Sequence, residues 1–597
     1  MSGVLLRWAC LVVLLGFGVR VAIAVPLWSD PYVPGTEILL AVLVGVYQDL
    51  IALVLLGGPL ALAFLAGVRV GRAVLLLLVA VVLVVAFAEL FFWWEFESRL
   101  NRLVFHYLLF PREVVTFLED QFYVSLYAIP ALLIIAAAYL VVRGRSADQR
   151  APSRWFLVGS VLACVVAVLV ASPLEFSSSR RINQMASNGY LGVLHAAVTD
   201  VSAWHGHYWN PAQPAPTRGE APGALGVVEP VWQPLPVKHV VLIVEESFSG
   251  EVWDDLALRG TYMPRFSSLA DSGVLFENVY STGTRTTRGL EALLNGFPPL
   301  PGIAVNQRGG FERLPSLARA LSLAGFHNVF VYGGWPGFSN FFPYWRALGY
   351  EELTSRDDFP EPRFETSWGV ADEHLFEAIR EHMSRLTQNH ERVFLTSLTV
   401  SHHRPFDFPA GRVPFPAEER RSEYALAYAD WALGQFIEDA SGEPWFDDTL
   451  FVIAADHGPR ISGDAPIPVA GFRVPLLLYA PAHLNPRRVD HLGSLMSFGV
   501  TLLELLGLPN DEGLYGDNLL LTEQGLVPME HEYQVGLLTR DGLTVLHLGG
   551  EVSGWRQEDD RLVLDAPDWE VAARAARLFH GAHQWFYGSA SAAADGR

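Results

Sequence analysis

The chain is poor in cysteine and has no run of basic residues, and each absence excludes a class of protein. Its 597 residues include two cysteines, Cys10 and Cys164, and both lie inside apolar runs. The polar part of the chain therefore has no disulfide and no catalytic thiol. The formal net charge is -21, and no basic stripe is present that could neutralise nucleic-acid phosphates. We therefore expect no nucleic-acid partner.

Long apolar runs dominate roughly the first 175 residues, and most of the acidic residues follow them. This segregation is typical of a membrane domain joined to a soluble acidic domain. The segments long enough to cross a bilayer are Leu5–Leu27, Ile38–Leu65, Ala73–Phe92, Tyr123–Val142 and Trp155–Ala171. Residues 1–175 are therefore predicted to form a multi-pass α-helical membrane domain of five helices.

The charges near these segments predict their orientation. Arginines cluster on the connections 69–72 and 143–154, whereas the connection 28–37 has neither Lys nor Arg. The positive-inside rule then places the N-terminus in the cytoplasm and everything after the fifth segment outside. Arg20 and Asp49 lie within the apolar segments, and we expect Arg20 to reach the outer interface with its long side chain.

The remaining chain changes character at Lys238. Residues 176–237 form a connector whose second half is rich in proline. From Lys238, apolar strand-like runs alternate with amphipathic helical patterns, which predicts a mostly parallel sheet covered by helices on both faces. We assign this α/β domain to residues 238–530 and a small C-terminal β/α addition to residues 531–597. The predicted strands are His239–Val244, Val274–Tyr280, Asn328–Tyr332, Val393–Val400, Leu450–Ala455 and Val474–Tyr479.

Three of these strands end in polar residues, at the sheet edge where α/β proteins bind ligands. The sequences are Glu-Glu-Ser at 245–247, Ser-His-His at 401–403 and Asp-His-Gly at 456–458. Two carboxylates, a hydroxyl and an imidazole at one edge suit Mn²⁺, Mg²⁺ or Zn²⁺. Taken alone, Asp-His-Gly is equally typical of a capped turn, and paired loop histidines are common. Their joint occurrence favours a metal site.

A hydroxyl-rich turn follows the strand 274–280 and leads into a helical pattern. It reads S-T-G-T-R-T-T-R-G-L-E-A-L-L-N-G from Ser281 to Gly296. Such a turn can place a nucleophile and phosphate-binding donors at a helix N-terminus, whose dipole favours an anion. By itself it is more often an N-capping turn beside solvated arginines. A nearby metal ion would lower the pKa of a coordinated threonine hydroxyl and stabilise charge on a phosphoryl group.

Five motifs occur in a fixed order behind the apolar segments. They are V-L-I-V-E-E-S, G-T-R-T-T-R-G-L-E-A, S-H-H-R-P-F, A-A-D-H-G and R-V-P-L-L-L-Y-A-P. Together they resemble the lipoteichoic acid synthase and phosphoglycerol transferase family of the alkaline phosphatase/sulfatase superfamily. The resemblance implies an enzyme of the bacterial cytoplasmic membrane whose catalytic domain lies on the outer, periplasmic side. It would transfer a phosphoglycerol headgroup from a phospholipid, phosphatidylglycerol first of all, to a hydroxyl of a glycan or glycerol-phosphate acceptor.

The same resemblance implies the roles of individual residues. Glu246, Thr286, Asp456 and His457 would hold one divalent metal ion, with Mn²⁺ preferred over Mg²⁺ or Zn²⁺. Thr286 would also be the catalytic nucleophile and would form a phosphothreonine intermediate. The substrate would be bound by His403 and Arg288.

Other readings fit the sequence less well. A sulfatase needs a Cys or Ser within C/S-x-P-x-R, which is absent here, and phosphoethanolamine transferases typically add disulfides and a P-C-M run. A non-enzymatic membrane sensor would be expected to have lost one of the four metal-site residues. The family's synthases carry Trp-Asn-Arg where this chain has Ser339-Asn340-Phe341. That departure allows an acceptor other than a growing glycerol-phosphate chain.

Overall fold

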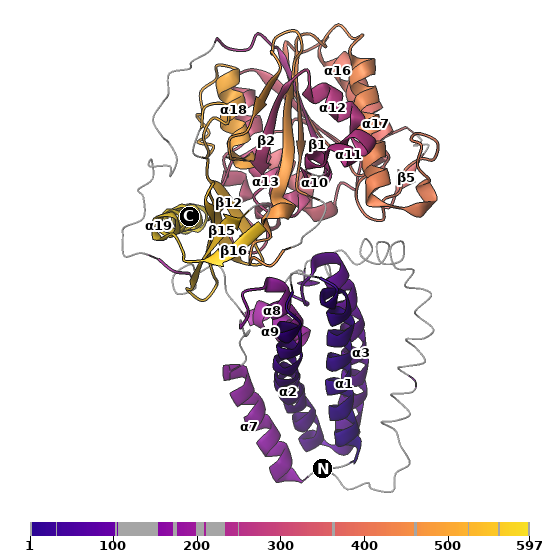
Figure 1. Ribbon diagram of the computed structural model, residues 1–597, viewed down its shortest axis with the longest axis vertical. Helices are drawn as coiled ribbons and strands as arrows, with labels where there is room; N and C mark the ends of the chain where they lie inside the picture. The colour runs from indigo at the N-terminus through magenta and orange to yellow at the C-terminus, as the bar shows by residue number, and fades with distance from the viewer. Residues whose placement is uncertain are drawn as a thin grey trace. The chain divides into compact units, whose positions relative to one another are not determined.

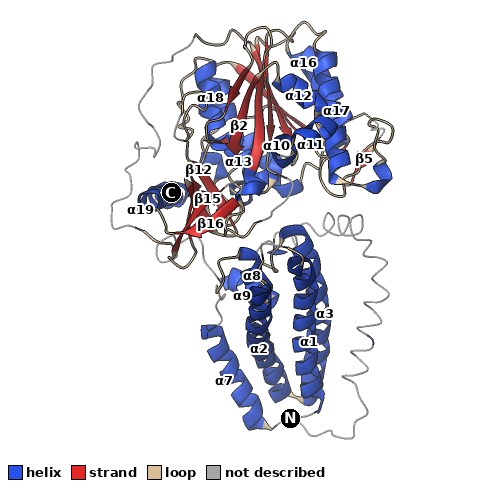
Figure 2. Cartoon of the chain, viewed as in Figure 1, coloured by secondary structure: helices blue, strands red, loops and turns tan. Residues whose placement is uncertain are grey.

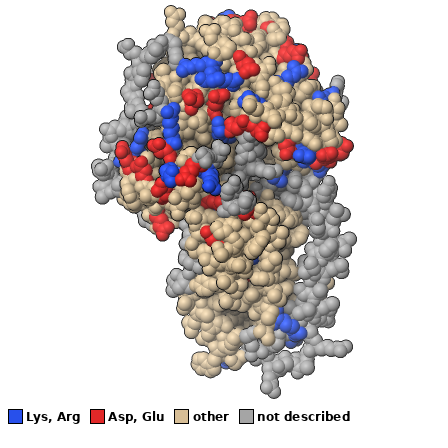
Figure 3. Space-filling view, viewed as in Figure 1, with Lys and Arg blue, Asp and Glu red and all other residues tan. Residues whose placement is uncertain are grey.

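The computed structural model divides the chain into two compact units, residues 1–200 and 201–597. It describes residues 3–30, 33–101, 104–105, 136, 153–170, 176–198, 208–210, 233–248, 250–360, 364–458, 463–522, 525–558 and 561–594. We call the first unit the helical unit and the second the α/β unit (Figure 1). Charged side chains gather on the α/β unit, whereas the visible surface of the helical unit is mostly uncharged (Figure 3).

The helical unit contains only helices among its described residues (Figure 2). They are α1 (Gly3–Trp28), α2 (Gly35–Ala66), α3 (Val68–Phe96), α7 (Arg154–Val170), α8 (Arg180–Ala186) and α9 (Gly189–Val198). Helices α1, α2 and α3 are long and apolar enough to cross a membrane, as predicted for the first three segments. Apart from residue 136, the fourth predicted segment, Tyr123–Val142, lies outside the described residues. The fifth corresponds to α7, an apolar helix of 17 residues that packs against α2.

A buried ion pair joins α1 to α2, and its arginine also contacts α8. Arg20 is fully buried, and its Nη1 and Nη2 lie 2.7 and 2.9 Å from the two carboxylate oxygens of Asp49. Arg20 also donates to the carbonyls of Met185 and Ser187, and Asn188 donates to Asp49. Our expectation that Arg20 reaches the interface was therefore wrong, because a buried charge is more stable when it is paired.

The α/β unit is built on a nine-stranded sheet with the order β10-β2-β9-β8-β1-β7-β3-β4, and β11 pairs with β2. Its strands are β1 (His239–Glu245), β2 (Val274–Tyr280), β3 (Phe326–Tyr332), β4 (Glu352–Thr354), β7 (Arg392–Leu398), β8 (Thr449–Ala455), β9 (Arg473–Tyr479), β10 (Arg487–Val489) and β11 (Gly493–Ser494). Only β9 runs antiparallel to its neighbours. The prediction of a mostly parallel sheet is confirmed.

Helices cover this sheet on both sides, with α18 on one side and α12, α16 and α17 on the other (Figure 1). The helices are α10 (Gly250–Asp254), α11 (Leu256–Tyr262), α12 (Pro264–Ala270), α13 (Thr286–Asn295), α14 (Leu317–Leu323), α15 (Phe341–Leu348), α16 (Asp372–Leu386), α17 (Ser422–Ala440) and α18 (Phe498–Leu505). A two-stranded ribbon pairs β5 (Glu365–Thr366) with β6 (Gly369–Val370).

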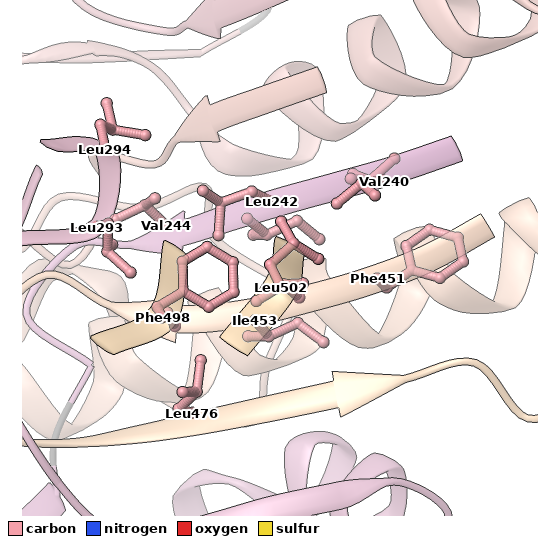
Figure 4. Packing of buried hydrophobic residues seen from close by; sticks show 14 of the residues in the cluster. Val240, Leu242, Val244, Leu293, Leu294, Phe451, Ile453, Leu476, Phe498 and Leu502 are labelled. Carbon is pink, nitrogen blue, oxygen red and sulfur yellow. The ribbon is translucent and has the colours of Figure 1, made fainter. Parts of the chain in front are cut away.

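Every residue of β1 is buried, which is why its sequence is apolar on both faces. Val240, Leu242 and Val244 alternate along the strand and pack beside Phe498 and Leu502 of α18 (Figure 4). Each such side chain contributes about 1.5–3 kcal/mol when it is fully buried. This rigid central strand carries the polar residues that follow it.

The C-terminal part of the α/β unit is a five-stranded antiparallel sheet with a helix packed on it. Its elements are β12 (Val527–His531), β13 (Gln534–Leu538), β14 (Gly542–Leu546), β15 (Val552–Glu558), β16 (Arg561–Asp565) and α19 (Trp569–Ala594). Helix α19 contacts β13 and β14. The predicted boundary between residues 530 and 531 falls inside β12, so this sheet begins earlier than we expected.

Candidate metal centre and nucleophile

The ends of two neighbouring parallel strands form the centre of the site. Glu245, the last residue of β1, is in register with Ala455, the last residue of β8. The residues that follow these strands therefore meet at one edge. The side-chain ligand atoms of Glu246, Asp456 and His457 all lie within 4.8 Å of one another.

Thr286 joins this group from the first position of α13. Its hydroxyl donates a hydrogen bond of 3.2 Å to Glu246 Oε2. Ser247 donates to the other carboxylate oxygen of Glu246, at 2.7 Å. The structure thus brings the four predicted metal-site residues together and places a hydroxyl at a helix N-terminus beside them.

The donor atoms are oriented in a way that suits a divalent cation. Asp456 Oδ1 accepts from the backbone N–H groups of Ser247 and His457, both at 2.8 Å, whereas its buried Oδ2 has no hydrogen-bond partner. His457 Nδ1 lies 2.7 Å from the carbonyl of Gly458 and donates to it. The imidazole therefore turns Nε2 towards the acids, 3.5 Å from Asp456 Oδ2 and 3.6 Å from Glu246 Oε1.

The electrostatics of the group are strongly coupled. Burial raises the pKa of Asp456 to about 7, and the charge of Glu246 adds to this effect. Burial also acts to raise the pKa of Glu246, but His403 and His457 outweigh it and hold that pKa below its usual range. Burial acts to lower the pKa of His457, while Asp456 and Glu246 raise it overall. Opposed shifts of this kind cluster at functional sites.

The two adjacent histidines have different environments. His402 is buried between the carbonyl of Glu246 and the hydroxyl of Ser422, and burial lowers its pKa to about 4. His403 is half-buried, lies against Trp368 in a tilted arrangement with ring centroids 3.9 Å apart, and donates from Nδ1 to the carbonyl of Arg404. It is the more exposed of the two histidines and lies close enough to Glu246 for an electrostatic interaction.

Arg288 does not lie at the site, contrary to our expectation. Its guanidinium is buried and pairs with Glu291 at 3.0 Å and Glu530 at 3.1 Å. It also donates to the carbonyls of Leu300 and Gly302. Residue 288 follows Thr286 by two positions, which rotates its side chain roughly 200° around the helix axis. The side chain therefore points to the opposite face of α13.

Sequence reasoning missed two groups that shape the site. Thr399, just after β7, accepts from the backbone N–H of Glu246 at 2.9 Å and donates to Glu245 at 3.0 Å. Arg285 precedes Thr286 at the N-terminus of α13, and its charge acts on His457. Position in the sequence could have identified both, since Thr399 lies near the end of the predicted strand Val393–Val400 and Arg285 lies in the hydroxyl-rich turn.

The sequence is similar to that of known proteins over the α/β unit. The Sulfatase family model matches residues 238–508. Phosphoglycerol transferase I of Xanthomonas campestris pv. campestris is 27% identical over 292 residues, which are 45% of this chain and 41% of that protein. The chain thus spans less than half the length of the curated relatives it matches.

Solved structures extend the comparison to the fold. An alkaline phosphatase superfamily protein from Vibrio parahaemolyticus is 28% identical with a TM-score of 0.55, and the match covers 60% of this chain and 89% of that one. The integral membrane protein lipooligosaccharide phosphoethanolamine transferase A from Neisseria meningitidis is 15% identical with a TM-score of 0.55. That match covers 87% of this chain and 98% of that one, so the likeness of fold includes the helical unit. The match to the Sulfatase model at residues 238–508, together with the apolar helices that precede it, supports a membrane-anchored protein of the alkaline phosphatase/sulfatase superfamily.

Proposed function

We propose that the protein transfers a phosphoglycerol headgroup from a membrane phospholipid to an acceptor hydroxyl, through a phosphothreonine at Thr286. The observation that carries this proposal is the 3.2 Å hydrogen bond from the Thr286 hydroxyl to Glu246, beside Asp456 and His457. A threonine hydroxyl is a weak nucleophile unless a neighbouring group activates it. Here the hydroxyl of Thr286 contacts Glu246, which we propose as a metal ligand. The curated relatives named phosphoglycerol transferase I support the identity of the transferred group.

A divalent ion fits the residues present. Glu246, Asp456, His457 and Thr286 would hold it, since the unpartnered Oδ2 of Asp456 and Nε2 of His457 lie 3.5 Å apart beside Glu246. Mn²⁺ is our first choice, with Mg²⁺ or Zn²⁺ as alternatives, because the donors mix oxygen and nitrogen. When bound, the ion would favour the alkoxide of Thr286 and stabilise charge on the phosphoryl oxygens.

The chain's own residues account for both half-reactions. Thr286 Oγ1 forms a bond to phosphorus as the bond to the diacylglycerol oxygen breaks, and the hydroxyl proton ends on that oxygen. In the second half, an acceptor hydroxyl bonds to the same phosphorus and Thr286 is released with its proton restored. His403, the imidazole beside the metal group, is suited to bind the phosphate and to carry these protons.

The helical unit supports a lipid donor, with phosphatidylglycerol as the one we propose. A covalent intermediate lets diacylglycerol leave through the bilayer before the acceptor arrives. The arginine distribution in the sequence supports a catalytic domain outside the bacterial cytoplasmic membrane. For domain organisation, we propose a transmembrane domain in residues 1–175, a connector in 176–237 and catalysis from 238 onwards.

The acceptor is more consistent with a glycan than with a glycerol-phosphate chain. Ser339 and Asn340 both have positive φ, 51° and 59°, and they replace the residues that the synthases use there. The carbonyl of Ser339 accepts from the side chain of Asn306 at 2.6 Å, and Asn340 donates to the carbonyl of Asn306 at 2.8 Å. These polar groups are engaged with the separate segment that contains Asn306, which supports a different acceptor.

The test uses purified protein in liposomes that contain headgroup-labelled phosphatidylglycerol or phosphatidylethanolamine. We expect diacylglycerol from phosphatidylglycerol and a mass increase on Thr286, both lost on chelation and restored by Mn²⁺. Thr286→Ala should abolish both signals, while Thr287→Ala, which removes the neighbouring hydroxyl, should retain most of the activity. Diacylglycerol from phosphatidylethanolamine alone would indicate phosphoethanolamine transfer. Hydrolysis of soluble phosphate or sulfate esters, without lipid turnover, would refute the lipid donor.

A further inference from the structure

The C-terminal sheet reaches the helix that carries Thr286. Glu530, on strand β12, is buried and accepts from Arg288 Nη2 at 3.1 Å. Its other oxygen accepts from the backbone N–H groups of Gly302 and Tyr533, both at 3.0 Å. Its own backbone N–H donates to the carbonyl of Thr282 at 2.9 Å, in the turn before Thr286. One residue therefore contacts the nucleophile segment both before and after Thr286.

Helix α13 needs outside support at this end. Its N-cap residue, Arg285, makes no side-chain cap hydrogen bond, and the helix is only 10 residues long. First turns without a cap fray most easily, because their N–H groups have no partner within the helix. Thr286 lies in that first turn, so a reactive hydroxyl depends on contacts made by other segments.

The opposite face of α13 is held just as closely. Gly289 lies so near the backbone of Asp456 that a Cβ would come within 2.7 Å of its Cα. The helix is therefore wedged between the strand end that carries Asp456 and the C-terminal sheet that carries Glu530. A shift away from one wall moves the Thr286 hydroxyl relative to Glu246.

We infer that Glu530 is a positioning residue, which holds α13 through Arg288 and fixes the Thr286 hydroxyl against Glu246. In this view, the C-terminal sheet is part of the catalytic machinery although it contributes no group to the metal site. The effect on turnover rests on the proposed role of Thr286, whereas the clamping of the helix does not. Arg288 has a counter-charge even without Glu530, since it also pairs with Glu291. Neutralising Arg288 is therefore not the main role that we assign to Glu530.

The test compares Glu530→Gln with a matched control in the full-length protein in lipid nanodiscs. Gln keeps the size of the side chain and can still accept from Gly302 and Tyr533, but it removes the charge from the pair with Arg288. The control is Glu512→Gln, which disrupts an ion pair of the same kind, Arg319–Glu512 at 2.7 Å, on α14. Both variants are measured for phosphorylation of Thr286 in a single turnover and for hydrogen exchange of residues 286–289.

We expect Glu530→Gln to slow phosphorylation about 10- to 100-fold at saturating lipid, with KM within about twofold, because a displaced nucleophile affects the reacting geometry and not lipid binding. The backbone amides of residues 286–289 should exchange faster in Glu530→Gln than in the wild-type protein. Their exchange rates should be unchanged in Glu512→Gln. Wild-type exchange in Glu530→Gln, or equal effects of both variants, would overturn the inference.

Two further outcomes are distinguishable. If the wild-type protein forms no phosphothreonine, the proposed function fails, and the exchange measurement still decides whether Glu530 clamps α13. If Glu530→Gln does not fold, Arg288→Lys replaces it, because Lys keeps the charge and loses the forked geometry that reaches Glu530 and two carbonyls together. Faster exchange is expected in that variant as well, and its absence would refute the clamp.

Discussion

Gly289 offers a test in which two physical effects oppose each other. In an ordinary exposed helix, Gly→Ala stabilises by about 1 kcal/mol, because Ala loses less backbone entropy on folding. At position 289 the new Cβ would lie 2.7 Å from both the carbonyl carbon and the Cα of Asp456, with the carbonyl oxygen closer still. These are backbone atoms, so no rotation of a side chain can remove the clash.

The displacement can be worked out from these distances. The nearest atom is the Asp456 carbonyl oxygen at 2.3 Å, and ordinary contact at a Cβ begins at 3.4 Å, so α13 or the Asp456 backbone must move by about 1.1 Å. Overpacking of this size costs about 1–3 kcal/mol, and the helix preference offsets about 1 kcal/mol of it. The net loss of stability is therefore small, roughly 0–2 kcal/mol. Activity is affected more, since a shift near 1 Å between reacting groups costs about 100-fold.

We therefore expect Gly289→Ala to reduce diacylglycerol release about 100-fold while it lowers the unfolding midpoint only slightly. The assay pairs turnover in liposomes with thermal unfolding of the same preparation. Gly309→Ala is the control, because nothing lies within 4 Å of its Cβ position. Full activity in Gly289→Ala would show that α13 and Asp456 are not held at a fixed distance during catalysis.

Two further predictions concern buried charge and pH. Asp49→Asn leaves Arg20 buried without a counter-charge, which should cost about 3–5 kcal/mol and lower the midpoint of thermal unfolding in detergent; Asp30→Asn, at a more exposed pair, should change it little. Burial lowers the pKa of His239 to about 4, so the unfolded chain takes up a proton first as the pH falls. Its contribution to stability is thus complete above about pH 6.5 and is lost towards pH 4, by about 2 kcal/mol between pH 7 and pH 5. In urea unfolding, His239→Asn should flatten that dependence, and an unchanged pH profile would contradict the assignment.

The elements best predicted from sequence were those whose pattern is set by local burial. The strand 274–280 has the bounds that we expected, and β8 and β9 each begin one residue before the predicted start. These runs are mostly apolar and buried, so their pattern identifies strands of a covered sheet. The short edge strands β4, β10 and β11 were missed, because two or three residues are too few to show a periodic pattern of apolar residues.

Errors arose where the outcome depends on partners distant in sequence. The antiparallel direction of β9 follows from the path of its connections, which no local pattern records. Arg20 and Asp49 were both noted in the sequence, yet their pairing requires α1 and α2 to pack in one register. Arg288 stands two residues from the nucleophile, but the helix turns it away. For residues in turns, nearness to a predicted site residue in the sequence correctly indicated nearness in space. Inside helix α13 it was misleading, because the helix directs adjacent side chains to different faces.

The adjacent glutamates at the end of β1 show how the sheet itself selects a metal ligand. Side chains alternate between the two faces of a strand, so only one of Glu245 and Glu246 can reach the site. Glu245 is fully buried and accepts from Thr399, and burial raises its pKa well above the usual range. Glu246, one position later, leaves the strand and meets Thr286 and His457 with a pKa held low. The strand register thus gives two identical adjacent residues opposite pKa shifts, and a one-residue shift of β1 would change which glutamate faces the metal group.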